Sequence, residues 1–227
     1  MRVSIFGDSI STCDGFQLPG YALYYDAENM ERNGITAPGE IWWQLLLQEM
    51  QWDLCVNNAY SGCRVSGGQY PSASSGDRIR MLRSEDASPE MVLIYLGFND
   101  FGFEVPVHPR GIAGRGKDRY FAPSYRKMLR EIRAMLPETK VLCGTLMGTC
   151  MSSAARLMYD TAWTEGLRPY NEAIEKACRA EGCTLVDLAG TGVKYETLDG
   201  VHPTAAGHRT IADTWAQCLE GTAICAD

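Results

Sequence analysis

The sequence predicts an α/β fold in which a parallel β-sheet is covered by helices on both faces. Short apolar runs alternate along the chain with longer amphipathic runs, which is typical of successive βαβ units. The apolar runs are continuous rather than alternating, as expected for strands that are buried on both faces. With 227 residues, of which 45% are hydrophobic and 22% charged, the chain is expected to fold as one domain over residues 1–227.

These runs place the strands and helices along the chain. Strands are expected at Val3–Phe6, Leu54–Val56, Met91–Leu96, Val141–Leu146 and Thr184–Leu188. Helices are expected at residues 41–50, 77–83, 125–136, 168–180 and 204–219. The third strand is the clearest, because MVLIYL is apolar without interruption. In the first helix, one of Trp42 and Trp43 is expected to be buried, because the side chains of adjacent helical residues diverge.

Three long connections interrupt this order, at residues 13–40, 101–123 and 148–167. Long segments without secondary structure are uncommon in compact domains and often carry function. All three leave from the carboxyl ends of predicted strands, which is where open α/β sheets bind their ligands. We therefore expect a functional site at this edge of the sheet.

Charge and composition narrow the possible partners and location. A formal net charge of −7 and a pI of about 5.1 argue against nucleic acid and against an anionic membrane surface as partners. No apolar stretch approaches the roughly 20 residues that a membrane-spanning helix needs, and no signal peptide is recognisable. The cysteines are scattered and form no C-x-x-C pair, which favours reduced thiols. A cytoplasmic protein is expected.

Polar segments stand after three of the predicted strands and before the last predicted helix. They are GDSI at 7–10, NNAYSG at 57–62, GFND at 97–100 and DGVHP at 199–203. Because the carboxyl ends of parallel strands share one edge of a sheet, we expect these segments to lie together. Such an arrangement would bring a serine, a glycine, an asparagine and a histidine to one place.

Acyl transfer from an ester needs this set of groups. A serine hydroxyl is a poor nucleophile unless a base removes its proton, so Ser9 is the candidate nucleophile and His202 its base. Asp199, three residues before the histidine, can accept a hydrogen bond from the ring and fix its tautomer. The oxyanion of the tetrahedral intermediate needs fixed donors, and the backbone amides of Ser9 and Gly62 and the side chain of Asn99 are the candidates.

Taken together, the four segments resemble the blocks of the GDSL/SGNH hydrolase family, which is named for Ser, Gly, Asn and His. The first block reads GDSI, with Ile10 in place of the usual Leu. The G-x-N-D block matches at residues 97–100, and the D-x-x-H block matches at residues 199–202. The second block is only a glycine in a variable context, so Gly62 is its least specific match.

The resemblance implies a flavodoxin-like α/β/α sandwich of about five parallel strands. It implies esterase, lipase, thioesterase or carbohydrate O-deacetylase activity, with neither a metal nor an organic cofactor. His208 lies six residues after His202, not four as in a helical zinc pair, and is expected to be structural. Gly67 and Gly68 are alternatives to Gly62 as the donor glycine.

Within this class we expect removal of acetyl or other short acyl groups from a carbohydrate, so the expected partner is a small-molecule or oligosaccharide ester. Tyr24 and Tyr25 in the first long connection offer flat rings on which a sugar could stack. Arg64 and Asp8 are further candidates for substrate binding, although Asp8 is expected mainly to join loop ends by hydrogen bonds. The alternatives are a lysophospholipase or thioesterase acting on longer acyl chains, and a non-catalytic carbohydrate-binding protein.

Overall fold

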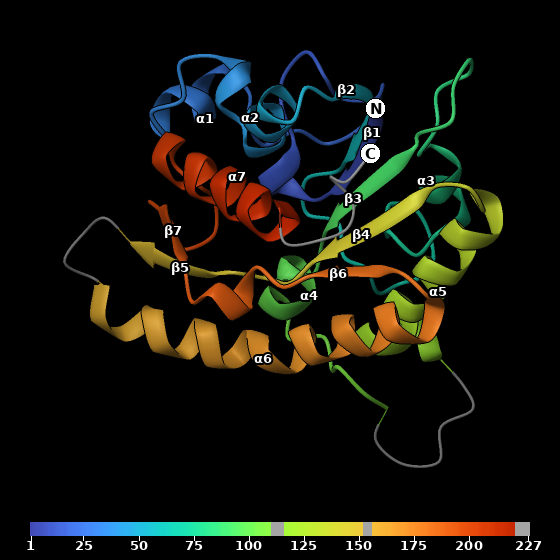
Figure 1. Cartoon of the computed structure of the whole chain (residues 1–227). Helices are drawn as coiled ribbons and strands as arrows, with labels where there is room; N and C mark the ends of the chain where they lie inside the picture. The colour runs from blue at the N-terminus through green and yellow to red at the C-terminus, as the bar shows by residue number, and fades with distance from the viewer. Residues whose placement is uncertain (110–115, 152–155, 221–227) are drawn as a thin grey trace.

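The computed structural model describes residues 1–109, 116–151 and 156–220, with only the backbone described for 156–164. Its central sheet has five strands: β1 (Arg2–Gly7), β2 (Asp53–Ala59), β3 (Met91–Tyr95), β4 (Lys140–Gly144) and β6 (Thr184–Val186). Their order is β2-β1-β3-β4-β6, and every neighbouring pair is parallel (Figure 1). The predicted strands and their parallel arrangement are confirmed.

Helices cover both faces of this sheet and complete the predicted three-layer sandwich (Figure 1). One layer contains α1 (Ala27–Arg32), α2 (Trp42–Glu49) and α7 (Ala205–Glu220), with α2 packed against α7. The other contains α5 (Phe121–Met135) and α6 (Arg156–Glu181), which pack against each other, and α3 (Gly76–Arg80) contacts α5. The short helix α4 (Phe98–Gly102) follows β3 directly.

Regular structure occurs where the sequence predicts a loop at 148–167. There β5 (Gly148–Met151) pairs in parallel with β7 (Lys194–Thr197), forming a separate two-stranded sheet. The helix expected to start at 168 already begins at Arg156 and continues through Pro169, while residues 152–155 lie outside the described part. The β5–β7 pairing joins distant segments, so no local pattern reveals it.

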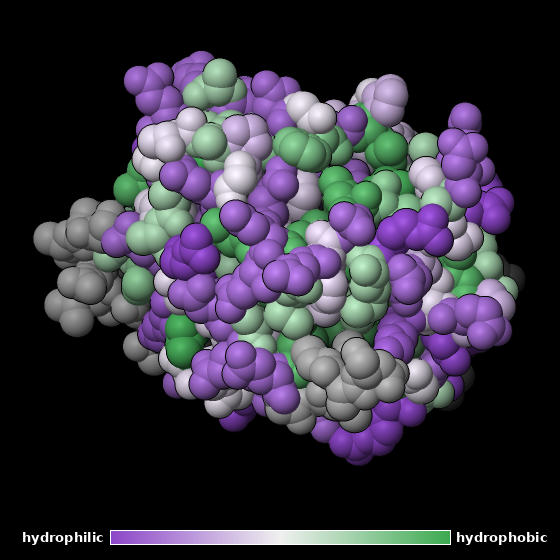
Figure 2. Space-filling view, turned by 45° about the horizontal axis from the view of Figure 1, so that its top comes forward, coloured by the Kyte–Doolittle hydropathy of each residue, from purple (hydrophilic) through white to green (hydrophobic). Residues whose placement is uncertain are grey.

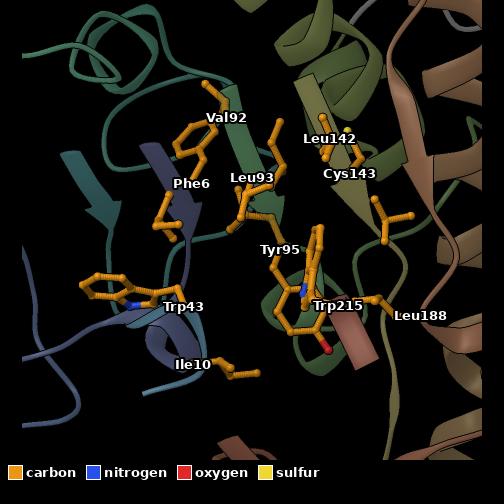
Figure 3. Close-up of a cluster of buried hydrophobic side chains, with 14 of the residues drawn as sticks. Phe6, Ile10, Trp43, Val92, Leu93, Tyr95, Leu142, Cys143, Leu188 and Trp215 are labelled. Atoms are coloured by element: carbon orange, nitrogen blue, oxygen red, sulfur yellow. The ribbon is translucent and has the colours of Figure 1, made fainter. Parts of the chain in front are cut away.

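Both tryptophans of α2 are fully buried, whereas the sequence predicts burial of only one. Figure 3 shows Trp43 among the buried hydrophobic side chains. Trp42 stacks on Trp215 of α7, with the ring centroids 5.6 Å apart. Trp43 is covered by Phe16 from the first long connection, at a centroid distance of 5.5 Å. The prediction was wrong because this connection covers a second side of α2, so both diverging side chains find apolar surroundings.

Exposed hydrophobic residues are scattered over the surface. Figure 2 shows a face on which hydrophilic and hydrophobic residues are interspersed. The large hydrophobic side chains that are exposed in the described part are Phe16, Tyr70, Met81, Phe103, Val193 and Leu198. Single exposed residues of this kind are common on protein surfaces. No helix within the described ranges is long and apolar enough to span a membrane.

Gly144, at the end of β4, has no room for a side chain. A Cβ there would lie 2.5 Å from the Trp215 ring and 2.9 Å from Leu188. We expect Gly144→Ala to lower the free energy of unfolding by about 1–3 kcal/mol, as overpacking of a core typically does. Gly39→Ala is the control, because no atom lies within 4 Å of its Cβ position. Urea unfolding of both variants checks this, and equal midpoints would contradict it.

Candidate active site

Ser9 lies in the tight turn that follows β1. The Asp8 side chain accepts a hydrogen bond from the Ile10 amide at 3.1 Å and thereby caps a short 3-10 helix over Ser9–Ser11. Aspartate is favourable at this position because its oxygen satisfies an amide that has no partner within the helix. The turn leaves Ser9 only 5% exposed. The predicted nucleophile therefore sits in an almost buried turn with a small opening to solvent.

Three side chains fix this turn through Ser11. The Trp42 indole donates to the Ser11 hydroxyl at 3.1 Å, and the Trp43 indole donates to the Ser11 carbonyl at 3.0 Å. The Asn57 amide of β2 donates to the same carbonyl at 3.1 Å. All of these side chains are buried. A buried donor without a partner costs about 1–3 kcal/mol, so the turn has little freedom to open.

Asp8 lies beneath the turn and not at the surface. It is fully buried, and within the described residues its Oδ2 atom has no hydrogen-bond partner. Burial raises the pKa of Asp8 to about 7, although the hydrogen bond from the Ile10 amide opposes this rise. Asp8 thus supports the turn, as expected, but it is closed off from a substrate, and its predicted substrate contact is wrong.

The candidate base and its partner lie on the segment between β7 and α7. One carboxylate oxygen of Asp199 accepts from the amides of Val201 and His202, at 2.9 and 2.8 Å. The other oxygen, Oδ2, lies 2.7 Å from His202 Nδ1. Across the ring, His202 Nε2 lies 3.0 Å from Ser9 Oγ, although these residues are 193 positions apart. The fold therefore joins Ser9, His202 and Asp199 in one chain of hydrogen bonds.

The ionisation of Asp199 determines which nitrogen of His202 carries the proton. Partial burial raises the pKa of Asp199, but the hydrogen bonds from the ring and amide of His202 outweigh burial and hold the pKa below its ordinary value. An ionised carboxylate can only accept hydrogen bonds, so the proton lies on His202 Nδ1. Nε2 is then left to accept from the Ser9 hydroxyl. This is the tautomer that a general base needs.

His208 has a structural place, as the sequence predicts. It is fully buried, and its Nδ1 accepts from the Trp42 amide at the start of α2, at 3.2 Å. Burial lowers the pKa of His208 to about 3, so the ring is neutral at ordinary pH. Among the side chains that the structure describes, no group of three or more His, Cys, Asp or Glu residues could hold a metal ion.

The glycine predicted for the oxyanion hole lies on a loop tied to the end of β1. The Tyr60 amide, two residues before Gly62, donates to the Gly7 carbonyl at 3.1 Å. Gly62 itself is exposed and has a φ of 77°, a left-handed conformation that favours glycine. No atom lies within 4 Å of its Cβ position, so the space beside its backbone is open.

Asp100 connects this loop to the helix that carries Asn99. Asn99 is half-buried in α4, which opens at Gly97 with a φ of 138°. The carboxylate of Asp100 accepts from the amides of Val65 and Ser66, at 2.7 and 3.0 Å. Burial raises the pKa of Asp100, and the two amide bonds oppose that rise. The loop of Gly62 and the helix of Asn99 are therefore held together by one buried carboxyl group.

The remaining predicted substrate contacts differ in exposure. Arg64 is exposed, and its guanidinium lies 5.6 Å from the centre of the Phe103 ring, so it is open to a ligand. Tyr24 is half-buried and stacks on His202. Tyr25 is fully buried. A sugar cannot reach Tyr25, and the prediction that this residue binds substrate is wrong.

Arg78 supports the site and was not foreseen from the sequence. It is fully buried and donates to the Asn58 side chain at 2.8 Å. It also donates to the carbonyls of Pro71, Asn58 and Gly7, at 2.7, 2.9 and 3.5 Å. These bonds join the ends of β1 and β2 beside the Ser9 turn. A cation on a short amphipathic helix looks like a surface residue, so the local pattern gives no signal for this role.

Comparison with known proteins identifies a family and similar structures for this chain. Residues 5–210 match the GDSL-like lipase/acylhydrolase family. No curated protein matches the chain. A Bacteroides uniformis structure assigned as a GDSL-like lipase is 22% identical, with a TM-score of 0.71 over 97% of this chain and 96% of that chain. A Bacteroides ovatus structure with the same assignment is 19% identical, with a TM-score of 0.70 over 97% and 98%.

A carbohydrate esterase has the same fold at lower similarity. The family 3 carbohydrate esterase of Clostridium thermocellum is 14% identical, with a TM-score of 0.59 over 96% of this chain and 94% of that chain. At such identities the solved structures establish the fold, whereas the family match extends over nearly the whole sequence. The protein therefore belongs to the GDSL-like lipase/acylhydrolase family.

Proposed function

We propose that this protein is a serine esterase that works through an acyl-serine intermediate and removes acetyl or other short acyl groups from a carbohydrate. The observation that carries the proposal is the hydrogen-bond chain from Ser9 through His202 to Asp199, with distances of 3.0 and 2.7 Å. Membership in the GDSL-like family supports hydrolysis of esters in general. The likeness to a carbohydrate esterase supports the carbohydrate part of the proposal.

In the first half of the proposed reaction, Ser9 Oγ attacks the ester carbonyl while His202 Nε2 takes the hydroxyl proton. Asp199 stabilises the imidazolium that forms. The bond from the carbonyl carbon to the alcohol oxygen then breaks, and the alcohol leaves with the proton from His202. In the second half, water attacks the acyl group and gives a proton to the same nitrogen. The acid leaves, and Ser9 regains its hydroxyl proton.

The amide of Gly62 fits the proposed oxyanion hole better than its two alternatives. A donor for the oxyanion must have no competing partner in the resting enzyme. Among the described residues, the Gly62 amide makes no hydrogen bond. The Gly67 amide donates to the Asp118 carbonyl at 2.7 Å, and the Gly68 amide donates to Ser72 Oγ at 3.2 Å. We therefore assign the amides of Gly62 and Ser9, with the Asn99 side chain, to the oxyanion.

A cluster of tyrosines from the Gly62 loop and the first long connection supports a carbohydrate as the substrate. Tyr21, Tyr60 and Tyr70 lie with ring centroids 5.3–6.2 Å apart, and Tyr70 is 47% exposed. An exposed tyrosine offers a flat apolar face and a polar hydroxyl, which suit the two kinds of surface on a sugar ring. Arg64, on the same loop, adds an exposed hydrogen-bond donor.

We expect Ser9→Ala to abolish ester hydrolysis while the protein stays folded. Removal of a triad nucleophile typically costs about 10⁶ in kcat. Turnover of a nitrophenyl acetate ester and labelling by a fluorophosphonate are measured for the wild type, for this variant and for Ser88→Ala, which alters an exposed serine. Ser88→Ala should behave as the wild type. Turnover by Ser9→Ala within tenfold of the wild type would place the nucleophile elsewhere, and an unlabelled wild type would favour a non-catalytic binding protein.

The proposed short-acyl preference predicts that acetyl esters are better substrates than octanoyl esters by at least about tenfold in kcat/KM. Each buried CH₂ group is worth about 0.8 kcal/mol, so a pocket for long acyl chains would give a steep rise in efficiency with chain length. A series of nitrophenyl esters from acetyl to octanoyl measures this trend. A rise along the series would support the lysophospholipase or thioesterase alternative.

Substitutions of Asn99 and His202 are expected to change the kinetics of ester hydrolysis in different ways. Loss of an oxyanion donor typically costs about 10²–10³ in kcat, so Asn99→Ala should lower kcat, leave KM nearly unchanged, and keep the wild-type fall in rate at acid pH. We assign that fall to the proposed base, so His202→Ala should lose it, and its rate should follow hydroxide instead. Profiles of kcat/KM against pH for the three proteins test both roles. An acid fall that is lost in Asn99→Ala, or kept in His202→Ala, would show that the roles are wrongly assigned.

A further inference from the structure

Tyr24 lies face to face with the imidazole of the candidate base. The ring centroids of Tyr24 and His202 are 3.4 Å apart, and the ring planes differ by 8°. The Tyr24 hydroxyl lies 3.4 Å from Asp199 Oδ2, the oxygen that also contacts His202 Nδ1. One side chain thus covers a face of the imidazole and reaches the carboxylate that orients it.

The Tyr25 side chain holds the backbone of the segment that carries His202. Its hydroxyl donates to the Pro203 carbonyl at 2.8 Å. Its ring is nearly perpendicular to the imidazole of His202, at a centroid distance of 6.5 Å, and its side chain is fully buried. Two consecutive residues of the first long connection therefore hold the ring of the base and the peptide next to it.

Thr12 connects these two tyrosines to the Ser9 turn. Its hydroxyl donates to the Ser9 carbonyl at 2.9 Å and accepts from the amides of Tyr24 and Tyr25, at 3.1 and 3.4 Å. A hydroxyl has one proton and two lone pairs, so these bonds use its whole capacity. Thr12 is fully buried, where no water can replace a lost partner. A single hydroxyl thus couples the backbone of the nucleophile to the residues that hold the base.

We propose that Tyr24 is a positioning residue for the His202 base and that Thr12 fixes Tyr24 relative to Ser9. This inference rests on the serine-esterase function proposed above. A ring held by one hydrogen bond at Nδ1 can still rotate about the axis of that bond. A flat ring stacked on its face opposes this rotation and keeps Nε2 directed at Ser9 Oγ. The π-face of Tyr24 also stabilises the imidazolium that forms during the reaction.

This role replaces the sugar stacking that the sequence predicts for Tyr24. One face of the Tyr24 ring is occupied by the imidazole, and Tyr25 packs perpendicular to the ring at a centroid distance of 4.9 Å. The Tyr24 ring is therefore occupied by contacts within the protein and not by a sugar. Its loss should affect the chemical step more than the binding of substrate.

Tyr24→Leu removes the stacked ring, and Tyr24→Phe keeps it while removing the hydroxyl. We expect Tyr24→Leu to lower kcat on an acetyl nitrophenyl ester by about 10–100-fold with KM nearly unchanged, because small displacements of a catalytic group cost this much. The rate of fluorophosphonate labelling of Ser9 should fall in parallel. Tyr24→Phe should stay within about threefold of the wild type in both measurements.

The Thr12 variants test the link to the Ser9 turn and remain informative if Tyr24→Leu does not fold. Thr12→Val removes the hydroxyl at nearly constant volume, and Thr12→Ser restores it. We expect kcat and the labelling rate to fall in Thr12→Val and to recover in Thr12→Ser. Tyr120→Leu, which alters a half-buried tyrosine at the start of α5, is the matched control and should be unchanged. Urea unfolding verifies that each variant is folded.

The outcomes separate this inference from the proposed function. A rise in KM at unchanged kcat and labelling in Tyr24→Leu would make Tyr24 a substrate contact and overturn the inference. An equal loss in Tyr24→Phe would assign the effect to the hydroxyl and overturn the role of the stacked ring. Unchanged kcat in Thr12→Val would remove Thr12 from the proposal. A wild-type protein with neither turnover nor labelling would instead overturn the esterase function itself.

Discussion

The proposed chemistry depends on the fixed conformation of the turn that carries Ser9, and the hydrogen bonds to Ser11 maintain that conformation. Two indoles of α2 and the amide of Asn57 converge on this one residue inside the core. Movement of the turn would leave these buried donors without partners, at about 1–3 kcal/mol each. The same tryptophans also pack against α7 and the first long connection. Core packing and the geometry of the nucleophile are therefore fixed by the same side chains.

Buried ionisable groups beneath the site act against stability. Arg78, Asp8 and Asp100 have no exposed surface, and removing a charge from water is costly unless it is fully hydrogen-bonded. Arg78 donates to carbonyl oxygens, and Asp100 accepts from two amides. Asp8 has one oxygen without a partner in the described residues, and burial raises its pKa to about 7, which reduces the charge that the core holds at neutral pH. These groups connect the segments that carry Ser9, Gly62 and Asn99. The segments of the site are therefore held together by groups whose burial costs stability.

The sequence predicts those parts of the fold and site whose signals are local. The strand MVLIYL and the D-x-x-H segment are each visible within a few residues, and β3 and the Asp199–His202 contact lie where these patterns place them. Pairing of β5 with β7, burial of both tryptophans and the bonds of Arg78 were missed because each depends on segments far apart in the chain. Tyr24 is an intermediate case. Its type and loop suggested the site, but residue type cannot tell a ring that stacks on a sugar from one that stacks on an imidazole.

Exposure of the acid–base pair explains why it needs support from its surroundings. The side chains of His202 and Asp199 are 18% and 36% exposed, and the neutral imidazole donates one hydrogen bond to the carboxylate. That bond alone does not oppose rotation of the ring about the axis of the bond. Backbone amides fix the direction of the carboxylate, since Asp199 Oδ1 accepts from two of them, and Oδ2 is left facing the ring. The stacked tyrosine then restricts the remaining rotation of the imidazole. The proposed base can therefore lie near the surface, where the leaving alcohol of the proposed carbohydrate ester would reach solvent.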